Sequence, residues 1–303
     1  MPRKYLLIFI VCFCQSSFSQ VKWQNVDADF QPLPPSVHVY FTNDKIDTGF
    51  FKAFYVIADI KDKQLAFTTD TTFKRRLTPS QFYQKNNHPV IVVNGTFFSF
   101  ETNQNLNVVV RDGKLLGYNV RKIKSKADTT KFIDEPMIRG VLGIDKKRNA
   151  DIAWIIADSV NKFPKAYQHY PSADTVINPD KWKMKTAIGG GPVILQNGKI
   201  AITNNQEKMF AGKAINDKHP RTCIGYTANN KLIIMVIEGR SESASGATLA
   251  QEAKLLQELG CIEGLNLDGG GSSCLLVNGK PTIAVSDKTG QRPVPAVFII
   301  HKK

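Results

Sequence analysis

Short runs of β-branched and aromatic residues recur along the whole chain, with turn residues between them. Runs of this kind predict β-strands. They are found at Val37–Phe41, Phe54–Ile60, Gln64–Thr68, Val90–Val93, Val108–Arg111, Ile152–Ile156, Lys231–Ile237 and Val297–Ile300. A chain patterned in this way must bury its apolar residues mainly between β-sheets.

Helical signals are confined to two segments. Thr78 precedes a proline at the first helical position, which predicts a short helix that continues to about Lys85. A longer helix is predicted over Thr248–Leu259, where Thr248 and Gln251 fit a capping box and a glycine follows the apolar stripe. We therefore predict an α+β protein with a large mixed β-sheet core and few helices.

The N-terminus has the pattern of a signal peptide. Arg3 and Lys4 precede a short apolar run, and Ser17 and Ser19 are the small residues that signal peptidase selects. Cleavage after Ser19 predicts a secreted or periplasmic protein with one domain over residues 20–303, and residues 1–19 as the leader. No apolar stretch reaches the roughly 18 to 20 residues that span a bilayer, so no integral membrane segment is expected.

The net charge limits the classes of binding partner, and the cysteine count limits the number of disulfide bridges. The chain of 303 residues has 40 Lys and Arg against 26 Asp and Glu, a formal charge of +14. In an exported protein this charge favours phosphorylated glycans and other anionic polymers over nucleic acid. The exported part keeps Cys223, Cys261 and Cys274, an odd number, so at most one disulfide bridge can form. The sequence leaves the oligomeric state open.

Three strongly apolar strands end in a polar residue followed by glycine. These residues are Asn94, Glu238 and Asp268. Continuous apolar runs are typical of central strands that are buried on both faces. A carboxylate at the end of such a strand lies where burial can tune its pKa for catalysis. If the strands are neighbours, these three side chains meet in one cleft, with Asp268 and Glu238 as candidate catalytic carboxylates.

The residues after Asp268 are suited to binding an anion. They are Gly269, Gly270, Gly271, Ser272 and Ser273. Consecutive glycines let the backbone approach a ligand closely, and their N–H groups can form a nest for phosphate. No Walker lysine follows, so the stretch does not fit a P-loop.

A weak internal repetition surrounds a second glycine stretch. Residues 189–191, which include the candidate substrate-binding residue Gly190, precede a strand and an Asn-Gly turn at 197–198. The same order follows Gly269–Gly271, with an Asn-Gly turn at 278–279. Residues 95–114 form a looser third copy, with an Asp-Gly pair at 112–113 in place of Asn-Gly. An Asn-Gly turn is the favoured two-residue connection of a β-hairpin, so three hairpins are predicted.

Two arginines complete the candidate site. Arg221 opens a predicted strand over 222–227, and Arg240 lies two residues beyond Glu238. The planar guanidinium of arginine suits a phosphate or a carboxylate. Among the histidines only His219, close to Arg221, is a candidate, because none has the spacing of a metal site. Zinc is not expected and no cofactor is required, although the sequence leaves a site for a divalent cation such as calcium open.

At these residues the chain resembles the phosphodiester glycosidase family. The resemblance covers about residues 50–300, and its one departure is Thr96, where a second glycine is expected. The matching segments are Asn94–Phe98, Gly189–Pro192, Arg221–Thr222 with Gly225–Tyr226, Glu238–Arg240, the helix from Thr248, and Asn266–Ser273. The resemblance implies a glycoside hydrolase that breaks the bond between the anomeric carbon of a sugar and phosphate in a sugar-1-phosphodiester.

That bond accounts for the types of residue present. The leaving group is a phosphomonoester, which is far more acidic than a sugar hydroxyl, so a strong general acid is less necessary. We expect one carboxylate to act as nucleophile or base, while Arg221, Arg240 and backbone N–H groups hold the departing phosphate. Asp268 is favoured over Glu238 because it adjoins the three glycines.

Two other functions remain open from the sequence. A non-catalytic glycan-binding module of the cell envelope would use Phe97, Phe98 and Trp182 as stacking platforms, and it would need no buried carboxylate. A phosphodiesterase would cut the P–O bond and would normally require a metal cluster of His and Asp, which the sequence lacks. The identity of the sugar and the retaining or inverting outcome are also open.

Overall fold

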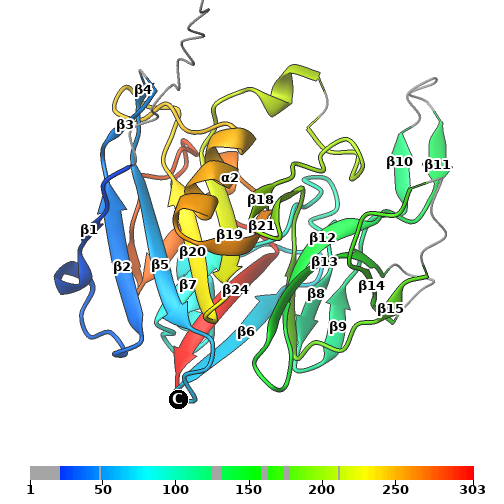
Figure 1. The fold of residues 1–303 in the computed structure, drawn as a ribbon, viewed down its shortest axis with the longest axis horizontal. Helices are drawn as coiled ribbons and strands as arrows, with labels where there is room; N and C mark the ends of the chain where they lie inside the picture. Colours follow the sequence, from blue (N-terminus) through cyan, green and yellow to red (C-terminus); the bar gives the residue numbers. More distant parts are fainter. Residues whose placement is uncertain (1–20, 48, 125–130, 158–162, 173–177, 211) are drawn as a thin grey trace, which may run out of the picture.

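The computed structural model describes residues 21–47, 49–124, 131–157, 163–172, 178–210 and 212–303. The predicted signal peptide and its cleavage point after Ser19 lie outside these residues. Three antiparallel sheets and two α-helices dominate the described part (Figure 1). No helix in the described ranges is long and apolar enough to cross a membrane.

An eight-stranded sheet forms one layer of the molecule. In spatial order its strands are β1 (Gln24–Asn25), β2 (Val37–Thr42), β5 (Ala53–Asp59), β20 (Lys231–Ile237), β19 (Arg221–Thr227), β21 (Cys261–Asn266), β17 (Val193–Gln196) and β18 (Lys199–Ile200). Helix α2 (Leu249–Glu258) covers one face of this sheet (Figure 1). Its capping box of Thr248 and Gln251 is confirmed.

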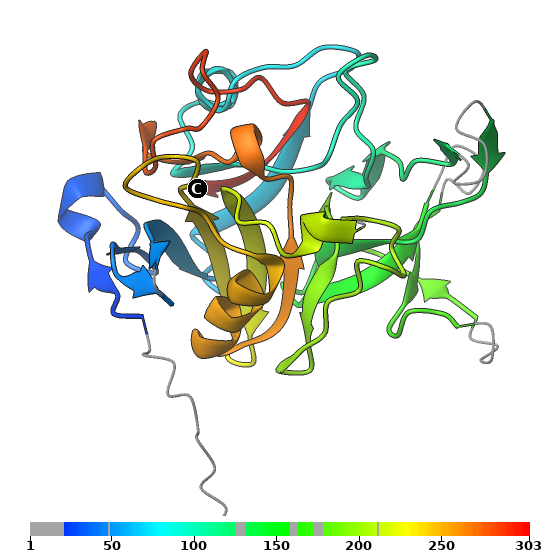
Figure 2. The same cartoon turned by 90° about the horizontal axis from the view of Figure 1, so that it is seen from above.

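The other two large sheets have five and seven strands. The five-stranded sheet contains β23 (Lys280–Pro281), β22 (Leu275–Val277), β7 (Ile91–Asn94), β24 (Ala296–Lys302) and β6 (Leu65–Thr71). The seven-stranded sheet contains β15 (Asp180–Lys181), β14 (Lys165–Tyr167), β13 (Ala150–Ile156), β12 (Arg139–Ile144), β16 (Thr186–Gly189), β8 (Val109–Arg111) and β9 (Lys114–Gly117). Figure 2 shows most of this seven-stranded sheet, in green, to one side of the other two.

The remaining elements are short. Helix α1 (Pro79–Lys85) packs against β7 and β22, and its N-cap Thr78 is as predicted. Two hairpins stand outside the large sheets, β3 (Lys45–Ile46) with β4 (Gly49–Phe50), and β10 (Lys122–Lys124) with β11 (Phe132–Asp134). Three 3₁₀ turns cover Asp27–Phe30, Gly212–Ile215 and Gly270–Ser272.

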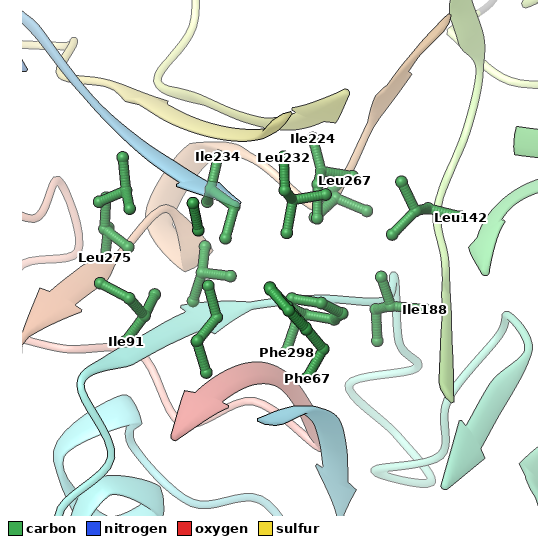
Figure 3. Close-up of a cluster of buried hydrophobic side chains, with 14 of the residues drawn as sticks. Phe67, Ile91, Leu142, Ile188, Ile224, Leu232, Ile234, Leu267, Leu275 and Phe298 are labelled. Atoms are coloured by element: carbon green, nitrogen blue, oxygen red, sulfur yellow. The ribbon is translucent and has the colours of Figure 1, made fainter. Parts of the chain in front are cut away.

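The main core lies between the eight-stranded and five-stranded sheets and continues to the seven-stranded one. Figure 3 shows Leu232 and Ile234 of β20 opposite Phe298 and Ile91, with Leu142 at the side of the seven-stranded sheet. Alternate residues of β20, such as Ile233 and Met235, pack under α2 instead. Both faces of β20 are therefore buried, as its continuous apolar run predicts.

The three predicted hairpins are confirmed by their turn geometry. Both central residues of each turn have positive φ, as type I′ hairpins require. The φ values are 50° and 72° at Asn197 and Gly198, 47° and 78° at Asn278 and Gly279, and 50° and 75° at Asp112 and Gly113. The repetition in the sequence therefore corresponds to three real hairpins.

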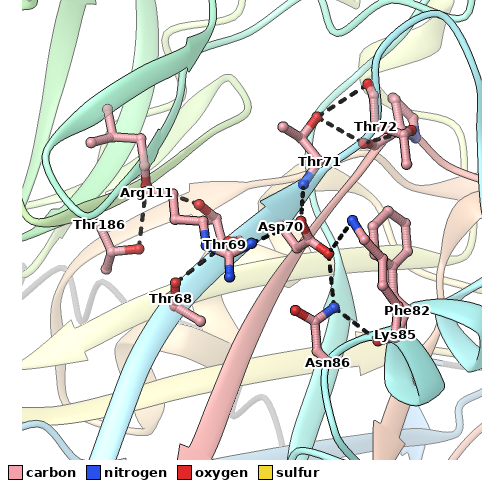
Figure 4. Close-up of polar contacts among 12 residues, drawn as sticks. Thr68, Thr69, Asp70, Thr71, Thr72, Phe82, Lys85, Asn86, Arg111 and Thr186 are labelled. Carbon is pink, nitrogen blue, oxygen red and sulfur yellow. Dashed lines mark hydrogen bonds and ion pairs between the residues drawn. The ribbon is translucent and has the colours of Figure 1, made fainter.

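A buried carboxylate joins the five-stranded sheet to its neighbours. Asp70 of β6 is 3% exposed and accepts hydrogen bonds from Lys85 Nζ (2.7 Å), Asn86 Nδ2 (2.8 Å) and Arg111 Nη1 (3.0 Å) (Figure 4). Lys85 and Asn86 lie at the end of α1, and Arg111 ends β8. A buried charge of this kind is retained because each of its oxygens is paired.

The predicted class, α+β with a large β-sheet core and few helices, is confirmed. One detail is corrected, since every strand pair among the described residues is antiparallel and the strands divide into separate sheets, whereas one mixed sheet was expected. Hairpin turns account for pairs of consecutive strands such as β12 with β13, whereas other antiparallel pairs, such as β5 with β20, join strands far apart in the chain. Cys223, Cys261 and Cys274 are buried free thiols.

Candidate active site

Three strands of the eight-stranded sheet bring their ends together. β19 lies between β20 and β21 and is antiparallel to both, so its first residue lies beside their last ones. Arg221 at the start of β19 is paired with Ile237, directly before Glu238. The ends of β20 and β21, which lead to Glu238 and Asp268, therefore lie on either side of the start of β19.

Glycine is required where these ends meet. A Cβ atom on Gly269 would lie 2.8 Å from the carbonyl oxygen of Pro220, and one on Gly239 would lie 2.9 Å from the nitrogen of Pro220. Real Cβ atoms do not approach other atoms so closely. The N–H of Gly270 donates to the Pro220 carbonyl at 2.8 Å. The Gly269 turn is therefore fixed against the start of β19.

Asn94 holds the same turn from the five-stranded sheet. Its side chain is fully buried, and Nδ2 donates to the carbonyl oxygen of Asp268 at 2.5 Å. Its Oδ1 accepts from Thr222 Oγ1 and from the N–H of Cys274, both at 3.0 Å. Because protein groups contact both ends of the amide, the geometry gives Asn94 a positioning role beneath Asp268.

Asp268 has the environment of a catalytic carboxylate. Burial raises its pKa to about 7, while Ser272, the Arg292 charge and the Gly269 N–H act in the opposite direction. Removal of water around a carboxylate disfavours its ionised form. Asp268 can therefore exchange a proton near neutral pH, which suits a catalytic acid, base or nucleophile.

Two guanidinium groups flank the glycine turn beside Asp268. A Cβ on Gly270 would lie 3.2 Å from Arg240 Nη2, and one on Gly271 would lie 2.1 Å from Arg292 Nη2. Arg240 is exposed and adopts a left-handed φ of 64°, a conformation that is uncommon for non-glycine residues. Arg292 is held by a 2.7 Å bond from Nε to Asp287.

Arg221 is close to this pair but is more enclosed. It is 2% exposed, and its guanidinium donates to the carbonyl oxygens of Ala247 (2.9 Å) and Asp217 (3.0 Å). Its Cζ lies 5.5 Å from the ring centroid of Phe210. Arg221 therefore supplies positive charge at the site from a fixed position in the protein interior.

His219 belongs to the same basic cluster. Arg240 Nη2 lies 3.3 Å from His219 Nδ1. Burial lowers the pKa of His219, and the charges of Arg221 and Arg240 lower it further. The imidazole is therefore neutral at pH 7 and can accept a proton or a hydrogen bond.

Glu238 is bound by protein groups rather than by the glycine turn. It is 3% exposed, its Oε2 lies 3.0 Å from Lys52 Nζ, and the same oxygen accepts from the N–H of Ala284 at 3.0 Å. These contacts attach the chain that leads to Arg292 onto the end of β20. The geometry thus favours Asp268 over Glu238 as the catalytic carboxylate.

The other predicted contacts lie around the end of β21. A Cβ on Gly190 would lie 2.4 Å from the carbonyl oxygen of Asn266, so this glycine allows close packing one strand away from Asp268. Ser272 and Ser273 are each 1% exposed. The buried Oγ of Ser273 has no hydrogen-bond partner among the described residues.

Aromatic rings line the approach to the arginines. Phe97 contacts Phe210 with ring centroids 6.0 Å apart, next to Arg221. Phe100 is 62% exposed, and Arg292 lies over its ring at 5.4 Å from the centroid. Of the three residues proposed as glycan platforms, Phe98 is 8% exposed, and Trp182 belongs to the seven-stranded side of the molecule.

Sequence reasoning missed two residues of the site. Arg292 lies in a loop before β24 and has no motif or spacing that marks it. Glu252 of α2 is fully buried, and burial raises its pKa to about 8 although the Arg221 charge lowers it. Its position could have been found, because Glu252 lies three residues after Leu249 and four before Leu256, on the apolar stripe of the helix.

Within the described residues, no group of three or more His, Cys, Asp and Glu side chains could hold a metal ion. The site offers one carboxylate of raised pKa, three arginines and a glycine turn that is fixed against the start of β19. These groups can stabilise a positive centre and an adjacent anion at the same time.

A family model and several curated proteins are similar to this chain. A family model described as phosphodiester glycosidase matches residues 87–301. The SPbeta prophage-derived uncharacterized protein YomE of Bacillus subtilis is 42% identical over 94 residues, which are 31% of this chain and 15% of that protein. The N-acetylglucosamine-1-phosphodiester alpha-N-acetylglucosaminidase of Mus musculus is 25% identical over 218 residues, which are 70% of this chain and 37% of that enzyme.

A solved structure has the same fold. It is the catalytic domain of the zebrafish N-acetylglucosamine-1-phosphodiester alpha-N-acetylglucosaminidase, with a TM-score of 0.64 at 18% identity. The match covers 90% of this chain and 86% of that one. The chain spans 15% and 37% of the length of the two curated relatives above.

Proposed function

The chain belongs to the phosphodiester glycosidase family, and from this premise we propose that it hydrolyses the bond between an anomeric carbon and phosphate in a sugar-1-phosphodiester. One observation carries the proposal. The Asp268 carboxylate and the guanidinium groups of Arg240 and Arg292 surround a single glycine turn. Breaking this bond places positive charge on the sugar and leaves a phosphate next to it, which is the pair of charges that such a turn can stabilise.

The proposed reaction adds water across the C1–O bond. The bonding electrons leave with the oxygen of the phosphate, which departs as a phosphomonoester, and the hydroxyl of water joins C1. Asp268 acts as nucleophile, forming a glycosyl ester that water then hydrolyses, or as the base that takes a proton from the attacking water. Arg240 and Arg292 hold the phosphate while it leaves, since the N–H of Gly270 already donates to the Pro220 carbonyl.

The other residues around the turn receive supporting roles in this proposal. Asn94 fixes the Asp268 backbone, Gly190 gives room for the end of β21, and Arg221 adds charge from below. Ser272 and Ser273 are proposed to contact the substrate, as the unpaired Ser273 hydroxyl suggests. Phe97 and Phe100 would pack against the sugar or its aglycone.

We propose that the protein acts after export, on a phosphorylated glycan or envelope polymer. The signal-peptide pattern before residue 20 and the formal charge of +14 support this location and this class of substrate. A catalytic carboxylate is needed only for an enzyme. A glycan-binding module would gain nothing from the raised pKa of Asp268.

A substrate panel tests the proposal. The purified protein is incubated with sugar-1-phosphodiesters that differ in sugar, and the release of free sugar and phosphomonoester is measured with and without a chelator. We expect turnover of at least one member, unchanged by the chelator. Loss of turnover in the chelator with recovery on adding calcium would show a cation site. Binding without turnover across the panel would favour the glycan-binding module.

A further inference from the structure

A second, strongly basic depression lies on the seven-stranded sheet. Its volume is about 970 Å³, and it is formed by the turn between β12 and β13, the start of β14, the end of β15 and the residues that follow. We name it the lysine groove. Its charged and aromatic lining includes Lys146, Lys147, Lys165, Lys181, Lys183 and Phe163.

The lysines of the groove are available to a ligand. All five are exposed, and none forms an ion pair with a carboxylate in the described part of the chain. Asp145 is the one acidic residue of the lining, and its oxygens already accept hydrogen bonds from the backbone and side chain of Asn149. The groove therefore has unbalanced positive charge, which favours an anionic ligand.

The groove also has an apolar side. Phe163 is 83% exposed, the largest exposed fraction of any large hydrophobic side chain among the described residues. Trp182 lies under the groove, with its indole N–H bonded to Asp151 at 2.5 Å. The exposed ring offers an apolar surface on which a sugar ring can pack beside the lysines.

The groove is separate from the candidate active site. None of Asp268, Arg240, Arg292, Arg221 and His219 lines it. Those residues come from the ends of β19, β20 and β21 and from the loop before β24, whereas the groove is built on β12 to β15. A ligand bound in the groove is therefore held away from the reacting bond.

We propose that the lysine groove binds an anionic polysaccharide chain. The proposal rests on the proposed function for the choice of polysaccharide, since a sugar-phosphate polymer would present repeating negative charges and sugar rings to the same surface. The lysine ammonium group is a compact point charge on a flexible side chain, so it can pair with phosphates whose positions along the polymer vary. A depression of this volume fits a polysaccharide chain better than it fits a flat membrane surface.

The test uses an inactive protein so that binding is measured without cleavage. In an Asp268→Asn background, Lys165, Lys181 and Lys183 are changed to Ser together. A matched control changes three exposed lysines outside the groove, Lys63, Lys199 and Lys303, to Ser. The probes are a polysaccharide joined by sugar-1-phosphate linkages, neutral dextran, a single-stranded oligonucleotide and vesicles of anionic phospholipid.

We expect the groove variant to bind the charged polysaccharide at least tenfold more weakly, and the control variant less than about twofold. Dextran should not bind. With Asp268 restored, the groove variant should turn over a small sugar-1-phosphodiester at the normal rate. Equal losses in both variants would overturn the proposal, as would tighter groove-dependent binding of the oligonucleotide or of the vesicles.

The proposed function and this inference fail separately. The protein could bind the polysaccharide through the groove lysines and yet cleave no sugar-1-phosphodiester. That result would support the proposed binding site and contradict the proposed hydrolase activity. If small substrates were cleaved normally and polymer binding did not depend on the groove lysines, the hydrolase activity would be supported and the proposed binding site would be contradicted.

Discussion

Replacement of Asp268 with asparagine is expected to lower the turnover of a sugar-1-phosphodiester at least about a thousandfold, on the scale of losing a principal catalytic group. Asparagine keeps the size of the side chain and removes the charge that stabilises C1 in the transition state. It also removes the nucleophile or base. The measurement is kcat on whichever substrate the panel identifies.

The thermal stability of the Asp268→Asn variant distinguishes a loss of catalysis from a loss of folding. The native pKa of Asp268, about 7, lies above its ordinary value of 3.8. Between these values the native state holds a proton that the unfolded chain releases, so Asp268 lowers stability as the pH rises from about 4 to about 7. The Asn variant lacks this penalty, and its Tm at pH 8 should equal or exceed that of the parent.

The dependence of the wild-type turnover rate on pH is a second test of the role of Asp268. A nucleophile or base must be ionised, so the rate should rise with pH and level off above about 7, where the carboxyl group has lost its proton. A rate that instead falls above pH 7 would make Asp268 a proton donor.

Glu238→Gln is the companion variant, because the two carboxylates compete for one role. We expect it to lose stability, since Lys52 and the Ala284 N–H lose a charged partner, while the folded fraction keeps most of its turnover. A dead Gln variant beside an active Asn variant would reverse the assignment. If both variants remained active, neither carboxylate would be catalytic, and the proposed hydrolase mechanism would be contradicted.

Arg240→Lys and Arg292→Lys are each expected to lower kcat/KM on a phosphodiester about ten- to a hundredfold. The loss corresponds to roughly 1.5 to 3 kcal/mol for one charge-assisted hydrogen bond. Lysine keeps the charge but cannot form the two parallel bonds of a guanidinium group. The measurement compares a sugar-1-phosphodiester with a neutral aryl glycoside, on which the losses should be much smaller.

Arg111→Lys is the matched control, since the guanidinium of Arg111 pairs with Asp70 rather than with the glycine turn (Figure 4). It should leave both substrates unaffected. Equal losses on the two substrates for Arg240 or Arg292 would assign that arginine a structural role. Arg221→Lys is less informative, because its guanidinium is bonded to two backbone carbonyls and the variant should also lose stability.

Local signals in the sequence were sufficient for much of the fold. Both helices begin at capping residues, so Thr78 and Thr248 located them to within a residue. The Asn-Gly and Asp-Gly pairs located three hairpins, because few other residues adopt two consecutive positive φ angles. How the strands divide among three sheets could not be predicted, since it depends on packing between segments far apart in the chain.

The candidate site was predictable only in part for the same reason. Asp268 and its glycines form one continuous stretch, so their proximity was certain from the sequence. The Glu238 pair with Lys52 joins residues almost two hundred positions apart, and Arg292 reaches the turn from a loop without a motif. The sequence marked Asn94 only as the end of an apolar strand, and its contact with the Asp268 carbonyl depends on the position of the five-stranded sheet.

The most direct test of the account is the position of bond cleavage in ¹⁸O-labelled water. The sugar and phosphomonoester products of the wild-type protein are separated and weighed by mass spectrometry. Attack at the anomeric carbon, supported by Asp268, predicts the label in the hydroxyl at C1 of the released sugar and none in the phosphate. Label in the phosphate, with none at C1, would contradict the account and identify a phosphodiesterase that cuts the P–O bond.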